Sequence, residues 1–187
     1  MLFGLVISFF DYNPLRTPEF NGLANYIGIF KDQAFLDSLL GTAIYVFGTV
    51  IPVWVFSLGL AIVLSKPIRL GGLWKVLLFL PTVIPTISIA LLWIPLLNDS
   101  GPINHLLNFF HLPSISWLTS PEAAPWAMIV LSWWHATSYY IFIFLAGLLA
   151  IPKMYYEAAT LDGAGSWLRF WYITIPLLKR SIALVVV

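Results

Sequence analysis

The residues that could do chemistry in this sequence are few, and a histidine with two nearby serines is the first set to consider. Ser132 lies three residues before His135 and Ser138 three residues after it, so a helix would make contact between them possible. A serine hydroxyl beside a histidine is the arrangement of a nucleophile and its general base. No Asp or Glu lies within reach to orient the imidazole. An enzyme, which the surrounding apolar run would make an intramembrane one, is therefore an alternative without further support.

Metal and nucleotide chemistry have even less support in the sequence. The three histidines, His105, His111 and His135, do not have the spacing of metal ligands on one helix, so we expect no metal site. The sequence contains no G-x-x-x-x-G-K-[S/T] motif to bind the phosphates of a nucleotide. A net charge of +1 gives no reason to expect a nucleic-acid partner. We therefore expect the chain to hold no cofactor and to catalyse nothing itself.

The most informative polar stretch runs from residue 151 to residue 180. The chain is 60% hydrophobic and 9% charged, with nine Lys or Arg and eight Asp or Glu. Six of these charged residues lie in the stretch: Lys153, Glu157, Asp162, Arg169, Lys179 and Arg180. Placing such a charge at the centre of a bilayer costs about 3 kcal/mol on insertion scales. The stretch is therefore expected to lie outside the hydrocarbon.

This stretch has the pattern of two short helices separated by a bend. Helix-forming residues dominate from Lys153 to Leu161, and Pro152 suits a first helical turn. Asp162 and Gly163 then predict the end of the helix, because glycine readily adopts the left-handed conformation there.

The second helix is expected to be short and amphipathic. Its side chains at i, i+3, i+4 and i+7 are Trp167, Phe170, Trp171 and Thr174. Pro176 is expected to interrupt it before the chain re-enters the membrane. In the first helix, Ala158 and Ala159 beside Glu157 present a small, flat surface that suits a groove on another protein. An ordinary amphipathic hairpin at the membrane surface is the alternative that the residues leave open.

Apolar runs around the polar stretches predict an all-α, polytopic transmembrane helical bundle. Crossing a bilayer takes about 20 apolar residues in a helix, and fourteen Phe, nine Trp and eight Tyr suit lipid and its interfaces. We expect one transmembrane domain over residues 1–187, partial because the sequence stops within apolar runs and is expected to be a fragment truncated at both ends. The expected spans are 1–10 (partial), 39–64, 73–97, 123–150 and 181–187 (partial).

The connections between these spans differ in charge. Residues 65–75 contain three cations and no acid, and residues 151–180 contain four cations. Residues 98–122 contain no Lys or Arg, and residues 11–37 contain two cations against four acids. Because cytoplasmic connections are enriched in Lys and Arg, we expect 65–75 and 151–180 in the cytoplasm, and 11–37 and 98–122 outside.

One run within the polar stretch is distinctive. It reads Glu157-Ala158-Ala159-Thr160-Leu161-Asp162-Gly163-Ala164, and Phe170, Ile173 and Pro176 follow it. The run resembles the EAA loop of permease subunits of binding-protein-dependent ABC importers. Likeness to the carbohydrate-type permeases, such as those of the maltose transporter class, extends over most of the chain. It is carried by Asn21-Gly22-Leu23-Ala24-Asn25-Tyr26, Phe79-Leu80-Pro81, Trp93, Gly101-Pro102-Ile103-Asn104, Trp117-Leu118, Trp133 and Leu145-Ala146-Gly147-Leu148 with Ile151-Pro152.

The resemblance implies a role for each residue of the run. In this family the EAA loop forms coupling helices that dock into a cleft of a cytoplasmic ATPase subunit. Carried over to this sequence, Glu157 is the charged anchor, Ala158 and Ala159 allow close approach, and Asp162 and Gly163 complete the contact, with Gly163 at the bend.

The resemblance also implies the partners and the location. The ATPase subunits would bind ATP and Mg²⁺, a second permease would complete a homo- or heterodimer, and an extracytoplasmic solute-binding protein would deliver the substrate. The subunit would lie in the lipid bilayer of a bacterial or archaeal plasma membrane and carry a sugar or related polyol. Permeases for oligopeptides, phosphate, polyamines or amino acids share the loop motif and are the alternative.

Two pairs of residues are candidates for lining a translocation path. Pro81 and Pro85 lie four residues apart on one helix face and should kink or break the third span, either as a packing kink or as a hinge beside the path. Trp133 and Tyr140 lie seven residues apart on one face of the fourth span, and aromatic faces stack on sugar rings. Packing against lipid or neighbouring helices is the alternative for the two aromatic residues.

Overall fold

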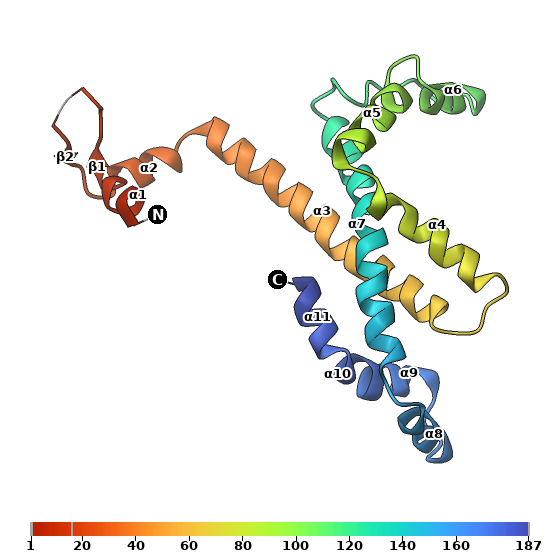
Figure 1. Ribbon diagram of the computed structural model, residues 1–187. Helices are drawn as coiled ribbons and strands as arrows, with labels where there is room; N and C mark the ends of the chain where they lie inside the picture. The colour runs from red at the N-terminus through yellow and green to blue at the C-terminus, as the bar shows by residue number, and fades with distance from the viewer. Residues whose placement is uncertain (1, 16, 187) are drawn as a thin grey trace. The chain divides into compact units, whose positions relative to one another are not determined.

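The structure is a computed structural model that describes residues 2–15 and 17–186. The chain divides into two compact units, Met1–Val46 and Phe47–Val187. Helix α3 (Gln33–Leu64) begins in the first unit and ends in the second. Almost all of the described elements are helices, as predicted (Figure 1).

The first unit is tied together by polar side chains. Helix α1 (Leu2–Ile7) leads into strand β1 (Phe10–Asp11), which pairs antiparallel with β2 (Glu19–Phe20), and helix α2 (Ala24–Ile29) follows. The Asn25 side-chain amide donates to the carbonyls of Ser8 at 3.0 Å and of Phe10 at 2.9 Å. Helix α1 ends three residues before the limit expected for the first partial span, and Asn25 ties the chain that follows it to α2.

Among the described residues, two helices are long and apolar enough to cross a membrane, namely α3 and α7 (Ala124–Leu149). Helix α3 starts six residues before the span expected at 39–64 and ends at the same residue. The first and last residues of α7 each lie one residue inside the span expected at 123–150. A third crossing is possible in the described residues if a bent helix pair counts as one span.

That bent pair occupies the third expected span. Helix α4 (Gly71–Val83) and the helical stretch that begins with α5 (Thr86–Leu97) are bent by 99° at the break between them. Ile84 is extended, with φ −77° and ψ 126°, because the ring of Pro85 excludes the helical conformation from the residue before it. The predicted kink or break is therefore a break, and Pro85 stands at the start of α5 while the buried Pro81 lies inside α4.

Helix α7 is the centre of the second unit. Residues of α3, α7 and α11 (Lys179–Val186) form a buried apolar cluster in it: Ala61, Leu64, Ile141, Phe144, Leu145 and Val185. Helices α4 and α11 both pack against α7 (Figure 1). Gly147 makes the approach of α11 possible, since a Cβ atom there would meet Ser181 Oγ and would lie 2.8 Å from Leu178 Cδ2.

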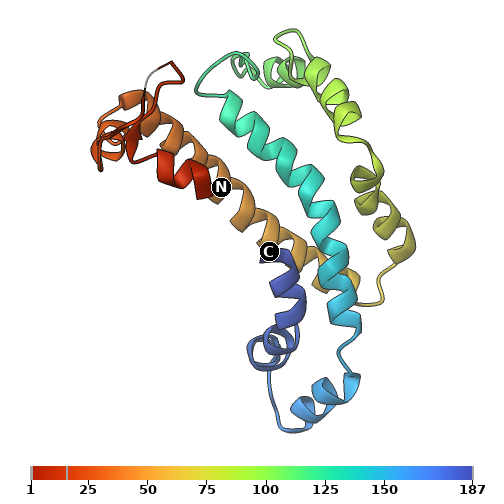
Figure 2. The same cartoon turned by 60° about the vertical axis from the view of Figure 1, so that its left-hand side comes forward.

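After α7 the chain forms a hairpin and returns. Helix α8 (Lys153–Leu161) is followed by α9 (Ser166–Arg169), the π-helical turn η1 (Phe170–Thr174) and α10 (Ile175–Leu177), and α11 then runs back beside α7 (Figure 2). The chain is helical at Pro176 itself, which lies inside α10 just after the π turn. The expected interruption falls two residues later at Leu178, where α10 has ended, and α11 begins at Lys179.

Candidate functional site

The hairpin of residues 151–177 contains all five residues expected to contact an ATPase. Pro152 immediately precedes α8, and Asp162 caps its C-terminus. Gly163 follows with φ +77°, and its amide donates to Thr160 O at 3.1 Å, while the Ala164 amide donates to Ala159 O at 2.8 Å. These two bonds form a Schellman motif, which requires the left-handed residue that glycine supplies. The bend predicted at Asp162 and Gly163 is therefore present.

Side-chain hydrogen bonds hold α8 against the helical segment that follows it. The Tyr156 hydroxyl lies 2.9 Å from Thr174 Oγ1, and Thr174 is buried. One turn further along the same face of α8, Arg169 Nη1 donates to Thr160 Oγ1 at 2.8 Å. Thr160 Oγ1 in turn donates to the Tyr156 carbonyl at 2.6 Å. The face of α8 that contains Tyr156 and Thr160 is thus bonded to the following segment at two residues, one before and one after Glu157 in the sequence.

The opposite face of α8 is exposed. Glu157, Ala158, Asp162 and Gly163 are exposed, and Ala159 is half-buried. Two apolar neighbours are exposed as well: Met154 at 66% and Leu161 at 90%. Met154, Glu157, Ala158 and Leu161 stand at i, i+3, i+4 and i+7, so they share one face of the helix. We call these four residues the α8 face.

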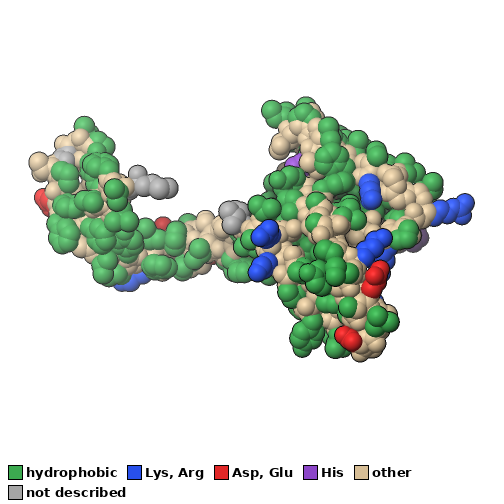
Figure 3. All heavy atoms as spheres, turned by 60° about the horizontal axis from the view of Figure 1, so that its bottom comes forward, with side chains coloured by type: hydrophobic (Ala, Val, Ile, Leu, Met, Phe, Trp, Pro, Cys, Tyr) green, Lys and Arg blue, Asp and Glu red, His purple; other side chains and the backbone are tan. Residues whose placement is uncertain are grey.

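Sequence reasoning missed Met154 and Leu161 as members of this face. The signal was available in their helical spacing from Glu157 and Ala158. An apolar residue as exposed as Leu161 at the end of a short helix is unfavourable in water and is typical of an anchor in a helix-in-groove contact. Seen from the end of the second unit that contains α8 and α9, hydrophobic side chains are mixed with Lys and Arg (Figure 3).

The four path candidates do not come together at one site. Trp133 and Pro81 line one cavity of about 280 Å³ between α3, α4 and α7, with Phe56 and Ser138 among its other walls. Tyr140 lines a separate cavity of about 250 Å³ with Thr82 and His135. Pro85 is exposed at the break between α4 and α5.

Trp133 has a structural role in this arrangement. Its indole N–H donates to the Gly48 carbonyl at 2.7 Å, and its ring lies 5.8 Å from that of Phe56. The side chain therefore joins α7 to α3, as the packing alternative predicts for it. Pro81 and Trp133 still share a cavity wall, so their path role stays a prediction.

The contacts of Ser138 are not those of a nucleophile paired with the His135 imidazole. Ser138 Oγ donates to the backbone carbonyl of His135 at 2.7 Å and also interacts with Thr82 Oγ1. The Ser138 hydroxyl thus contacts the main chain of His135 and joins α7 to α4. In the described part of the chain, no three His, Cys, Asp or Glu side chains lie close enough together to hold a metal ion.

The connection at the other end of α7 is organised around a buried amide. Asn104, in α6 (Pro102–Phe109), is 1% exposed. Its Nδ2 donates to the carbonyls of Asn98, Asp99 and Ile115, and its Oδ1 accepts from the Ile115 amide and the Trp117 indole. The Asn104 and Trp117 motifs of the resemblance are thus parts of one structural element.

One carboxyl group in this connection has a shifted pKa. The Ser120 hydroxyl donates to Glu122 Oε2 at 2.6 Å, and this bond lowers the pKa of Glu122 below its ordinary value, with help from the Glu122 backbone amide. Ser120 Oγ also accepts from the amides of Glu122 and Ala123, just before α7 begins. The shift therefore reflects the turn into α7 and does not indicate a catalytic acid.

Comparison with known proteins agrees with this fold. Residues 54–187 match the family described as "Binding-protein-dependent transport system inner membrane component". A solved structure, "Crystal structure of bacterial alginate ABC transporter in complex with alginate pentasaccharide-bound periplasmic protein", aligns with a TM-score of 0.79 at 22% identity, over 99% of this chain and 62% of the other. At that identity the likeness shows the fold alone.

Curated relatives are closer in sequence. The probable ABC transporter permease protein YesP of Bacillus subtilis (strain 168) is 36% identical over 181 residues, 95% of this chain and 58% of YesP. The trehalose/maltose transport system permease protein MalF of Thermococcus litoralis is 32% identical over 170 residues, 90% of this chain and 58% of MalF. The lactose transport system permease protein LacF of Rhizobium radiobacter is 32% identical over 186 residues, 97% of this chain and 62% of LacF.

The chain thus spans about three fifths of the length of the curated relatives it matches. The resemblance expected from the EAA-like run is confirmed, since the family match covers the α8 face and the whole hairpin. The chain belongs to the family of binding-protein-dependent transport system inner membrane components.

Proposed function

We propose that this chain is part of the permease subunit of an ATP-driven ABC importer and that its α8 face docks into a cytoplasmic ATPase subunit. The observation that carries the proposal is the exposure of the α8 face on a helix whose back is fixed. A helix held in this way can transmit a push, because Tyr156–Thr174 and Arg169–Thr160 connect it to the segment leading into α11.

Each residue of the face has a physical role in this contact. Leu161 and Met154 supply apolar area that becomes buried on docking, and Ala158 keeps the helix backbone close to the partner. Glu157 is the charge that fixes register against a cation of the ATPase. ATP and Mg²⁺ belong to that partner, and hydrolysis there would move the hairpin and the helices behind it. A second permease chain would complete the translocation path.

The proposed substrate is a sugar or related polyol. The names of MalF and LacF state trehalose or maltose and lactose as the substrates of their systems. The alginate ABC transporter of the solved structure is in complex with a periplasmic protein that carries an alginate pentasaccharide, which supports a solute-binding protein as the extracytoplasmic partner here. Uptake of labelled sugars, peptides and amino acids by the complete transporter tests this assignment, and uptake of peptides or amino acids alone would refute it.

The proposed orientation places 65–75 and 151–180 in the cytoplasm, and 11–37 and 98–122 outside, in a bacterial or archaeal plasma membrane. This chain contains no cysteine, so single cysteines introduced at Ser166 and Ser114 would be its only thiols. In intact cells, a membrane-impermeant maleimide should label Ser114→Cys and not Ser166→Cys. The reverse pattern would contradict the orientation.

The coupling role is tested by Glu157→Lys in the complete transporter. We expect the variant to insert normally but to lose ATPase co-purification and transport, because the reversed charge repels its partner cation. Lys179→Glu reverses a charge outside the α8 face and serves as the matched control. Normal co-purification and full transport by Glu157→Lys would make the docking assignment wrong.

A further inference from the structure

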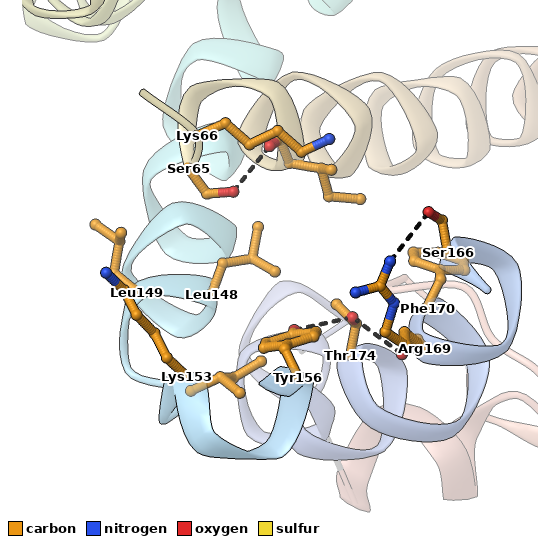
Figure 4. A pocket seen from close by; sticks show the side chains of 12 residues that line it. Ser65, Lys66, Leu148, Leu149, Lys153, Tyr156, Ser166, Arg169, Phe170 and Thr174 are labelled. Carbon is orange, nitrogen blue, oxygen red and sulfur yellow. Dashed lines mark hydrogen bonds between the residues drawn. The ribbon is translucent and has the colours of Figure 1, made fainter. Parts of the chain in front are cut away.

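A cavity of about 470 Å³ lies beside the hairpin and is not explained by docking of the α8 face (Figure 4). Its walls come from the C-terminal ends of α3 and α7, from α8, and from the segment α9–η1. The first two are ends of membrane-spanning candidates and the others form the polar hairpin. The cavity therefore lies where apolar helices meet a polar surface.

The cavity lining is cationic. Lys66, Lys153 and Arg169 line it, and none of the described residues that line it is acidic. In Figure 4 the Lys66 side chain reaches over the space from the turn that follows α3, and the Arg169 guanidinium points into it from the hairpin. Arg169 also donates to the hydroxyls of Thr160 and Ser166, which orient its head without neutralising its charge. Three cations around one space favour an anion.

One hydroxyl group adds a donor to the same lining. Ser166 Oγ accepts from Arg169 Nη2 and keeps its own proton available, whereas Ser65 Oγ donates to the Ile62 carbonyl and the Tyr156 hydroxyl bonds to Thr174. Phosphate oxygens accept hydrogen bonds from a hydroxyl and from guanidinium and ammonium groups. The three cations and Ser166 thus supply the donors that a phosphate group requires.

The rest of the lining is apolar and continues onto an exposed apolar surface. Ile62, Leu148 and Leu149 line the cavity, and Leu149 is 61% exposed. Val63, next to Ile62 on α3, is 52% exposed. A small soluble anion gains nothing from this apolar side, whereas the acyl chains of a lipid would bury it.

We propose that this cavity binds the phosphate headgroup of an anionic phospholipid, with Lys66, Lys153 and Arg169 around the phosphate and the acyl chains along Ile62 and Leu149. Basic pockets between helices at the cytoplasmic membrane surface are suited to anionic headgroups. The site would clamp the hairpin to the end of α3 and so tie the coupling element to the lipid. It requires only that the cavity lies at a membrane surface and does not depend on docking of an ATPase.

The test is a titration of phosphatidylglycerol into the delipidated complete transporter in detergent, with bound lipid counted by native mass spectrometry. In the double variant Lys66→Gln/Lys153→Gln we expect the affinity of the tightest lipid to fall by about 25-fold, about fivefold for each charge. Arg169 is left intact because its bonds to Thr160 and Ser166 help to hold the hairpin. Lys66 lies outside the hairpin, so Lys66→Gln alone should leave the hairpin intact. It should lower the affinity of the tightest lipid by about fivefold, even if the double variant disturbs the hairpin.

Lys179→Gln/Arg180→Gln is the matched control, since it removes two cations that do not line the cavity. The control should keep wild-type affinity, and phosphatidylcholine should bind both variants equally. Wild-type affinity in Lys66→Gln, or an equal loss in the control, would overturn the proposal. Displacement of phosphatidylglycerol by an equal concentration of inorganic phosphate would reassign the site to a soluble anion. Loss of ATPase co-purification in Lys66→Gln with unchanged lipid affinity would reassign it to a protein contact.

Discussion

The two polar connections at the ends of α7 are stabilised in opposite ways. In residues 98–117 the hydrogen bonds converge on one buried side chain, Asn104, which is 1% exposed. In residues 151–177 a few bonds run across the back of α8, and its outer face, including Leu161 at 90% exposure, is open. The first connection is fixed from within by this one buried side chain, although most of its other residues are exposed. The second keeps its shape while leaving a surface free for a partner.

The two connections also need glycine for different reasons. A Cβ atom on Gly101, at the start of α6, would lie 2.6 Å from the carbonyl oxygens of Leu96 and Pro95. Gly163 has open space around it and is needed only for its φ of +77°. Gly101 is therefore required by packing, and Gly163 by backbone conformation.

The largest effect is expected for Asn104→Ala in the complete subunit. Loss of the amide removes five hydrogen bonds at a buried position, which we expect to cost about 3 kcal/mol of unfolding free energy. Chemical denaturation in detergent measures it. Asn108→Ala is the control on the same helix, since Asn108 Oδ1 accepts a bond from Ser114 Oγ at an exposed site. Equal losses in the two variants would show that Asn104 does not organise the connection.

A smaller effect is expected for Gly101→Ala, and a smaller one still for Gly163→Ala. Gly101→Ala must move backbone carbonyls, which should lower the free energy of unfolding by about 2 kcal/mol. Gly163→Ala places an alanine in the left-handed region, which should lower it by about 1 kcal/mol. Gly165→Ala should be close to neutral, because Gly165 has φ −68° and open space. Thermal unfolding of the three variants gives the order, and a larger loss for Gly163→Ala would reverse the comparison.

The smallest effect is expected for Tyr156→Phe. It removes the bond to Thr174 and should destabilise the hairpin by about 0.5 kcal/mol without changing residues 98–117. Hydrogen exchange should therefore speed up in residues 153–177 and stay unchanged in 98–117. Tyr155→Phe alters an exposed neighbour and should change neither region. Unchanged exchange in the hairpin of Tyr156→Phe would show that this bond does not hold α8.

Much of the hairpin could be predicted from local sequence. Gly163 after a run of helix formers predicted the bend, and the EAA-like run predicted the family, because both signals lie within a few consecutive residues. The position of the interruption, two residues after Pro176, could not be predicted, since the π turn before the proline is set by several residues together.

The path candidates depended on contacts between helices that are distant in sequence. Nothing near Trp133 indicated that its indole would bind the Gly48 carbonyl, 85 residues away. Its separation from Tyr140 into a different cavity likewise depends on how α3 and α4 pack against α7. Spacing along one helix was therefore insufficient to place the two residues at a common site.

The most direct measurement is protection of the α8 face by the ATPase. Single cysteines at Ala158, on that face, and at Phe109, 76% exposed in residues 98–117, would be labelled with maleimide in the detergent-solubilised permease subunits, with and without the ATPase. We expect the ATPase to slow labelling of Ala158→Cys and to leave labelling of Phe109→Cys unchanged. Equal labelling of Ala158→Cys with and without bound ATPase would contradict docking of the α8 face.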